Sequence, residues 1–256
     1  MKAPAPIRRA AGLCAALAAA LPAAAQTTPT ATDAWQFEVI PYLWAAGIRS
    51  DLKLGPFPGD TVNVSSTSVL KALEFGVMGT LEARKGDWGG LLDMQYVKLR
   101  ASKEVAGGLA GGYDADYEQQ IYTVAGFYRV TNSSSVAVAV LAGARYVDAK
   151  TQVDVVVPIT VGPGRRVDET TGGWNGIVGV RAIVPVGDKW SLLGYVDLGT
   201  GSSSTSSWQA IAGASYQYSP VTSFKFGYRA LSYKRDDAVL NKVTMGGLYA
   251  GAGLRF

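Results

Sequence analysis

The chain has 256 residues, of which 48% are hydrophobic and 17% are charged, a composition that excludes a largely disordered protein. Its 31 glycines exceed the average share of about 7% and favour turns, strands and close approach of backbones. The chain contains no histidine. This absence removes the commonest general base and metal ligand, and with them most hydrolytic and zinc mechanisms.

Residues 1–25 have the features of a cleaved secretory signal peptide. Three basic residues precede an apolar run, Ala10–Ala25, which ends in small residues, as signal peptides do. A membrane-spanning helix is the alternative, but it needs about 20 apolar residues, and this run is shorter and interrupted by Pro22. The single cysteine, Cys14, lies inside the signal. We therefore expect export and a mature chain without cysteine.

Most of the apparent basicity belongs to this signal. The formal net charge of the whole chain is +4, and without the three basic residues of the signal, 21 Lys and Arg stand against 20 Asp and Glu. Nucleic-acid binding would need a basic stripe or a recognisable module, and the sequence has neither. No later apolar run is long enough for a spanning helix. We therefore expect no nucleic-acid partner and no helical membrane protein.

After Gln26 the chain shows ten stretches in which alternate positions are apolar, the pattern of transmembrane β-strands. The expected strands are Trp35–Ile48, Glu74–Arg84, Trp88–Arg100, Asp116–Val130, Val136–Asp148, Gly173–Val186, Trp190–Gly201, Trp208–Tyr218, Ser223–Tyr233 and Thr244–Phe256. Pro41 lacks a backbone donor inside the first of them, so we expect a bulge or a strand break there.

The connections between these stretches alternate between short and long. Links such as Lys85–Asp87 and Gly187–Lys189 are short, whereas Arg49–Leu73 and Ala149–Gly172 are long. Bacterial outer-membrane barrels have short periplasmic turns and longer external loops. The sequence therefore predicts an all-β, transmembrane, antiparallel up-and-down β-barrel over residues 35–256, following a short periplasmic segment at 26–34. Ten strands are expected, with eight as the alternative if two stretches form an external hairpin.

Charged residues collect on the phase opposite to the apolar one, which we assign to the lumen because a charge facing lipid is costly. The expected lumen charges are Glu38, Glu74, Glu82, Arg84, Asp93, Arg129, Arg145, Arg181, Asp197, Lys225, Arg229 and Arg255. Lys98 and Glu118 fall on the outward phase, so we place both beyond the hydrocarbon layer. A barrel of ten strands lies near the size that side chains fill. Pairing of the lumen charges into a closed plug is therefore favoured over an open, charge-selective path.

Aromatic residues cluster at the ends of the expected strands, as in the interfacial girdles of membrane barrels. Trp35, Trp88 and Trp190 begin rising strands, and Trp174 and Trp208 begin falling ones. The alternative is that they are core residues of a soluble β-protein. We therefore expect one girdle at each interface.

The last segment, Gly246–Phe256, has alternating apolar residues and a final phenylalanine, and it resembles the strand that the bacterial barrel-assembly machinery reads. The whole mature chain resembles small outer-membrane barrel proteins of Gram-negative bacteria, broadly OmpA- and OmpW-like. Trp35–Gly47, Leu81–Leu99 and Gly227–Arg229 look like an uncharacterised branch. The resemblance implies an outer-membrane location, an assembly signal at Phe256, and outer-membrane lipids and the assembly machinery as partners.

The expected function is that of a non-enzymatic barrel for envelope structure or limited passage of small solutes. An adhesive or recognition surface on the external loops is the alternative, and Thr151–Val161 could extend a hairpin above the membrane. A third possibility, an enzyme acting on lipid or peptide, is disfavoured because similar outer-membrane enzymes use histidine. Ser68–Leu73 could form one helical turn in the first loop. We expect no cofactor and no metal.

Overall fold

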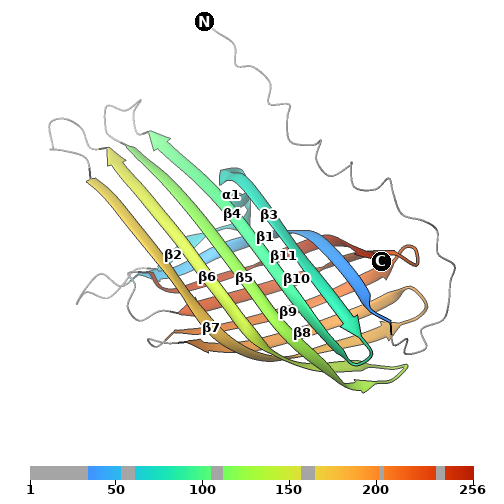
Figure 1. The fold of residues 1–256 in the computed structure, drawn as a ribbon. Coiled ribbons are helices and arrows are strands. Elements are labelled where there is room, and N and C mark those ends of the chain that lie inside the picture. The colour runs from blue at the N-terminus through green and yellow to red at the C-terminus, as the bar shows by residue number, and fades with distance from the viewer. Residues whose placement is uncertain (1–33, 53–60, 105–111, 157–164, 202–204, 235–239) are drawn as a thin grey trace, which may run out of the picture. The chain divides into compact units, whose positions relative to one another are not determined.

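The structure is a computed structural model that describes residues 34–52, 61–104, 112–156, 165–201, 205–234 and 240–256. Ten antiparallel strands form one closed barrel (Figure 1) because the last strand, β11, pairs with the first, β1. These strands are β1 (Gln36–Leu52), β3 (Leu73–Lys85), β4 (Trp88–Glu104), β5 (Gly112–Asn132), β6 (Ala137–Val156), β7 (Arg165–Val186), β8 (Trp190–Gly201), β9 (Ser206–Gln217), β10 (Thr222–Lys234) and β11 (Leu240–Arg255). The prediction of ten strands is confirmed. The expected signal peptide lies outside the described residues, as does the expected segment up to residue 33.

Two further elements lie between β1 and β3. A short strand, β2 (Thr61–Val64), pairs only with β1 and was not expected from the sequence. Ser65 is the N-cap of helix α1 (Ser66–Ala72), because its side chain accepts a hydrogen bond from the backbone N–H of Ser68. The structure thus has a seven-residue helix where a single turn was expected. Within the described residues, no helix is long and apolar enough to cross a membrane.

The strands meet in tight turns at one end of the barrel, which we call the short-turn end, and we call the opposite end the long-loop end. Gly86 and Gly187 lie in two of these turns with φ of 59° and 70°, a conformation that only glycine adopts without strain. Several strands run further toward the long-loop end than expected. The outer parts of β4 to β7 are mostly polar, so apolar alternation could not reveal them, and β6 confirms a strand from Thr151 to Val156.

The strands are tilted against the barrel axis. Following the paired residues once around the wall from Glu38 leads back to Ser50 on the same strand, a shift of twelve positions. Ten strands with this shift tilt by about 40°, as in other closed barrels. Residues that are paired on neighbouring strands therefore lie at different depths in a membrane.

A belt of exposed apolar side chains surrounds the barrel. Leu43, Val178, Leu198 and Leu248 are each more than 60% exposed, which in water would be an aggregating surface and in lipid is a normal one. The belt is bordered by paired aromatic rings at both ends. Rings at the short-turn end include Trp35–Phe37, Trp88–Tyr128 and Trp190–Tyr216, and those at the long-loop end include Phe75–Tyr96 and Tyr146–Trp174. The exposed Trp208 lies toward the long-loop end of β9.

Pro41 causes neither the bulge nor the strand break that the sequence predicts. Strand β1 continues through Pro41, and its register with β11 is the same on both sides of that residue. Its pairing with β3, however, ends at Pro41 and Gly79. Beyond this point β1 stays paired with β11 and β3 stays paired with β4. One seam of the wall is therefore paired over only part of its length.

Candidate functional site

The lumen is crossed by two buried ion pairs, and the first joins β6 to β8. Both terminal nitrogens of Arg145 donate to the carboxylate of Asp197, at 2.8 and 2.5 Å. Arg145 also donates to Thr123, and Tyr195 donates to Asp197 at 2.7 Å. The Arg145 and Asp197 side chains are fully buried. A two-pronged charged pair of this kind is strong and directional.

The second ion pair joins β10 to β4. Arg229 donates to Asp93 at 2.8 Å and to the hydroxyl of Tyr42 at 2.7 Å. Asp93 also accepts hydrogen bonds from Tyr42, Thr80 and Gln95. Its carboxylate therefore has a partner for each oxygen, as a buried charge requires.

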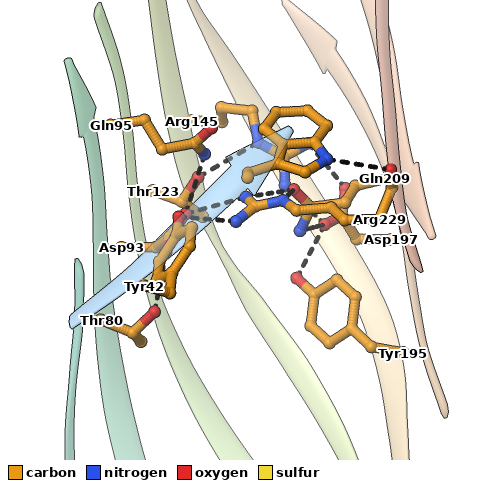
Figure 2. Close-up of polar contacts among 11 residues, drawn as sticks. Tyr42, Thr80, Asp93, Gln95, Thr123, Arg145, Tyr195, Asp197, Gln209 and Arg229 are labelled. Atoms are coloured by element: carbon orange, nitrogen blue, oxygen red, sulfur yellow. Dashed lines mark hydrogen bonds and ion pairs between the residues drawn. The ribbon is translucent and has the colours of Figure 1, made fainter. Parts of the chain in front are cut away.

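Gln209 on β9 connects the two ion pairs. Its amide oxygen accepts from Arg229 at 2.6 Å, and its amide nitrogen donates to Asp197 at 3.4 Å. Figure 2 shows the resulting group, which we call the central network and which contains Tyr42, Thr80, Asp93, Gln95, Thr123, Arg145, Tyr195, Asp197, Gln209 and Arg229. These residues come from eight of the ten barrel strands. The network therefore crosses the whole width of the lumen.

Apolar side chains fill the lumen on both sides of the central network. Toward the long-loop end lies a cluster that includes Tyr42, Trp44, Ile121, Leu231 and Met245. Toward the short-turn end lies a second cluster that includes Ala125, Phe127, Leu141, Ile177 and Tyr195. Water would have to pass both clusters and the network in order to cross the barrel.

A second set of charges lies near the short-turn end. Arg181 donates to Glu82 at 2.6 Å, and its guanidinium lies 4.4 Å from the ring centre of Phe127. Lys225 pairs with Glu38 at 2.9 Å. We call these two contacts the rim pairs. Their side chains are 13 to 21% exposed, so they are less buried than the central network.

The remaining expected lumen charges lie outside the central network and the rim pairs. Glu74 is a correction: its side chain is 42% exposed and pairs with Lys98 at 3.1 Å, because a register irregularity at Leu73–Phe75 interrupts the alternation of faces. Arg84 and Arg255 lie near the short-turn end, where Arg84 donates to Gln36 and Arg255 comes within 3.7 Å of Glu38. Arg129, at the same end of β5, is only partly buried and lies apart from the central network.

Sequence reasoning missed the uncharged members of the central network. Tyr42, Gln95, Thr123 and Tyr195 occupy the same alternating phase as the charges on their strands, and Gln209, whose strand carries no charge, lies on the phase opposite to the exposed Trp208. That phase was the available signal. Trp44 also shares it, and its indole nitrogen donates to the backbone carbonyls of Arg229 and Gly247.

The C-terminal Phe256 closes the barrel at the short-turn end. Phe37 and Phe256 exchange two backbone hydrogen bonds of 3.1 Å, and their rings stack at 5.8 Å. The side chain of Phe256 is 64% exposed. An aromatic ring is therefore exposed at the short-turn edge of the wall.

The buried carboxylates of the central network are engaged in ion pairs and hydrogen bonds. Each oxygen of Asp93 and Asp197 accepts at least one hydrogen bond from an arginine or hydroxyl donor. Among the described residues, no group of three or more potential metal ligands is close enough to hold an ion.

Comparison with solved structures places the fold among outer-membrane barrels. The outer-membrane protease OmpT of Escherichia coli matches with a TM-score of 0.54 and 8% identity, over 90% of this chain and 98% of that one. Ail of Yersinia pestis matches with a TM-score of 0.35 and 15% identity, over 88% and 100% of the two chains. Neisserial surface protein A matches with a TM-score of 0.37 and 15% identity, over 87% and 97%.

No protein-family model and no curated protein matches the sequence. At 8% identity, the likeness to OmpT concerns the fold alone. Together with the apolar belt and its aromatic borders, this fold identifies the chain as a bacterial outer-membrane β-barrel protein.

Proposed function

We propose that the protein is a non-enzymatic, non-conducting barrel that contributes to envelope structure. The carrying observation is the central network, which joins opposite walls of the lumen through residues that are almost all less than 10% exposed. Two apolar clusters back it on either side. Such a filled interior agrees with the rule that barrels near eight strands are packed, whereas open channels have about 16.

Single-channel conductance in a planar bilayer tests this proposal. We expect the refolded mature chain to be silent once heat-dependent gel migration shows that it is folded. A variant with Asp93→Ala, Arg229→Ala, Leu231→Ala and Phe127→Ala should conduct, because it removes one ion pair of the network and one large side chain from each apolar cluster. Lys150→Ala, an exposed change outside the lumen, is the matched control and should stay silent. Discrete, charge-selective steps from the unchanged protein would contradict the proposal and favour solute passage.

A second candidate function is surface recognition by the outer parts of β4 to β7. This region, which we call the outer sheet, extends beyond the neighbouring strands (Figure 1): β7 pairs with β6 up to Arg165, whereas its pairing with β8 stops at Asn175. Arg100 and Asp116 form an exposed ion pair of 2.8 Å on its outward face. Replacing residues 151–170 by a short turn should leave heat-modifiable folding intact and abolish binding of whole cells to a target surface. Unchanged binding would count against this role.

The likeness to OmpA- and OmpW-like barrels belongs to the same proposal. It concerns the whole mature chain with its terminal segment Gly246–Phe256, whereas Trp35–Gly47 resembles an uncharacterised branch. An enzymatic role has less support, because the chain has no histidine and its buried acids Asp93 and Asp197 are held in ion pairs with arginines.

A further inference from the structure

The seam between β1 and β3 is open in the half of the apolar belt nearer the long-loop end. Pairing stops at Pro41 and Gly79, and β3 then runs past Val77 to Phe75, which belongs to the aromatic border. On the long-loop side of the opening, β2 takes the place of β3 beside β1, from Ile48 onward. The opening spans Tyr42 to Gly47, about 20 Å along the strand at 3.3 Å per residue.

The opening leaves buried backbone groups without partners. Phe37 exchanges hydrogen bonds with β11, so the odd-numbered residues of β1 turn their peptide groups to β11 and the even-numbered ones turn them toward β3. Tyr42, Trp44 and Ala46 are the even-numbered residues of the opening, and no described strand pairs with β1 beside them on that side. All three are less than 9% exposed. More than 90% of buried backbone groups are hydrogen-bonded, and open sheet edges do not face lipid.

The two large side chains beside the opening point in different directions. Trp44 reaches over β11 to the carbonyls of Gly247 and Arg229, whereas Tyr42 crosses the seam on the lumen side and donates to Asp93 on β4. On the outer side, Leu43 is 71% exposed and Val77 is 53% exposed. An occupant of the opening would therefore meet an apolar strip outside and hydrogen-bonding edges within.

Two cations lie at the top of the opening. Arg49 follows Leu43 on the outward phase of β1, and Lys71 lies in the last turn of α1. Both side chains are exposed. The chain runs closely over this place, since a methyl group on Gly47 would come within 3.1 Å of the carbonyl of Val64. Positive charge thus lies where the apolar belt ends, at the level of lipid head groups.

We propose that the open seam between β1 and β3 is a binding site for one anionic lipid of the outer leaflet. Its acyl chain lies along Leu43 and Val77, its ester or amide oxygens accept from the unpaired N–H groups of Trp44 and Ala46, and its head group lies between Arg49 and Lys71. Lipid is the occupant that this site fits because the opening is continuous with the lipid-facing belt. The central network closes the lumen below it, so the site opens to the membrane.

Disulfide trapping tests whether the seam is open in a bilayer. The mature chain is expected to lack cysteine, so a pair can be introduced cleanly. Val39 and Leu81 are direct partners below Pro41, and Val39→Cys with Leu81→Cys should oxidise rapidly, since such pairs meet the geometric limits of a disulfide. Leu43 and Val77 would be partners if the same register continued. Leu43→Cys with Val77→Cys should oxidise at least tenfold more slowly. Equal rates would mean a closed seam and would overturn the proposal.

Native mass spectrometry of the refolded barrel tests the occupant. Barrels taken from vesicles of equal parts phosphatidylglycerol and phosphatidylcholine should retain one phosphatidylglycerol. Arg49→Gln with Lys71→Gln should lower this retention by roughly tenfold, because each cation at a membrane surface attracts anionic lipid appreciably. The matched control, Lys150→Gln with Lys189→Gln, removes the same charge at exposed positions away from the seam and should retain the lipid.

Three results would overturn the lipid site: equal retention of the two lipids, equal loss in the control, or unchanged retention in the Arg49 and Lys71 variant. Heat-dependent gel migration establishes that every variant compared is folded. The conductance of the barrel is a separate readout, so failure of the lipid site and failure of the proposed closed lumen can be told apart.

Discussion

The central network and the rim pairs use the same chemistry at two levels of the lumen, and they differ in burial. Arg145 and Asp197 are completely enclosed, whereas Arg181 and Glu82 are 13 and 19% exposed. The central network also shares hydrogen bonds through Gln209, while Arg181 rests on Phe127. Enclosure makes each charge in the network depend on its partner, because water cannot replace a lost contact there.

Among the charges of the lumen, those of the connected middle layer therefore contribute more to stability than those of the rim. Near the short-turn end, water can hydrate a rim charge that loses its partner. On the outer sheet, the pair of Arg100 and Asp116 is more exposed still, with Arg100 61% exposed. Three levels of burial therefore predict three sizes of effect.

The largest effect is expected for Arg145→Met, which leaves the buried Asp197 without its cation. Breaking a buried pair costs about 3 to 5 kcal/mol, so we expect a loss of that size in the free energy of unfolding, measured by denaturant titration in vesicles. Arg145→Met with Asp197→Leu is the control. The double variant should recover most of the loss, and no recovery would mean that the pair is not the source of the effect.

A smaller effect is expected for Arg181→Met at the rim. A hydrogen bond to a charged group contributes about 1.5 to 3 kcal/mol, and the partial exposure of Glu82 should place the loss at the lower end of that range. The same titration measures it. A loss as large as that of Arg145→Met would contradict the distinction between the two levels.

The smallest effect is expected for Asp116→Asn on the outer sheet. Exposed ion pairs contribute about 0 to 1 kcal/mol, and salt screens them. The change in unfolding free energy should therefore lie below 1 kcal/mol, and whatever change is seen should shrink further in about 1 M salt. An effect that persists in salt would show that this part of the outer sheet is packed more tightly than its exposure indicates.

Much of the architecture can be predicted from the sequence because lipid on one side and a narrow lumen on the other impose strict alternation. Charges such as Asp93, Arg145 and Arg229 stand out against that alternation, so their inward position could be inferred. Their partners could not. Which acid faces which arginine depends on the twelve-position shift around the wall, and no local pattern in the chain encodes it.

The failures have specific physical causes. Glu74 was assigned to the lumen by counting positions along β3, and one irregular residue near the end of that strand changes the face on which it lies. The open seam was hidden because β1 keeps its alternating pattern from Tyr42 to Gly47 whether or not β3 is paired beside it. Pro41 marks the place where the pairing of β1 with β3 ends, but its missing donor faces β11, where the ladder skips Ile40 and Pro41 and keeps its register.

The meeting of Phe37 and Phe256 bears on how the chain could be reordered. Because the first and last strands are joined edge to edge, a short linker could connect their ends, and new termini could be opened in the turn at Gly86, since circular permutation succeeds where ends lie close together. The permuted wall would keep every strand neighbour while Phe256 became an internal residue. Comparing the yield of the permuted protein in cells with its stability after refolding would separate two contributions of a terminal aromatic residue. One is to insertion into the membrane, and the other is to the stability of the folded barrel.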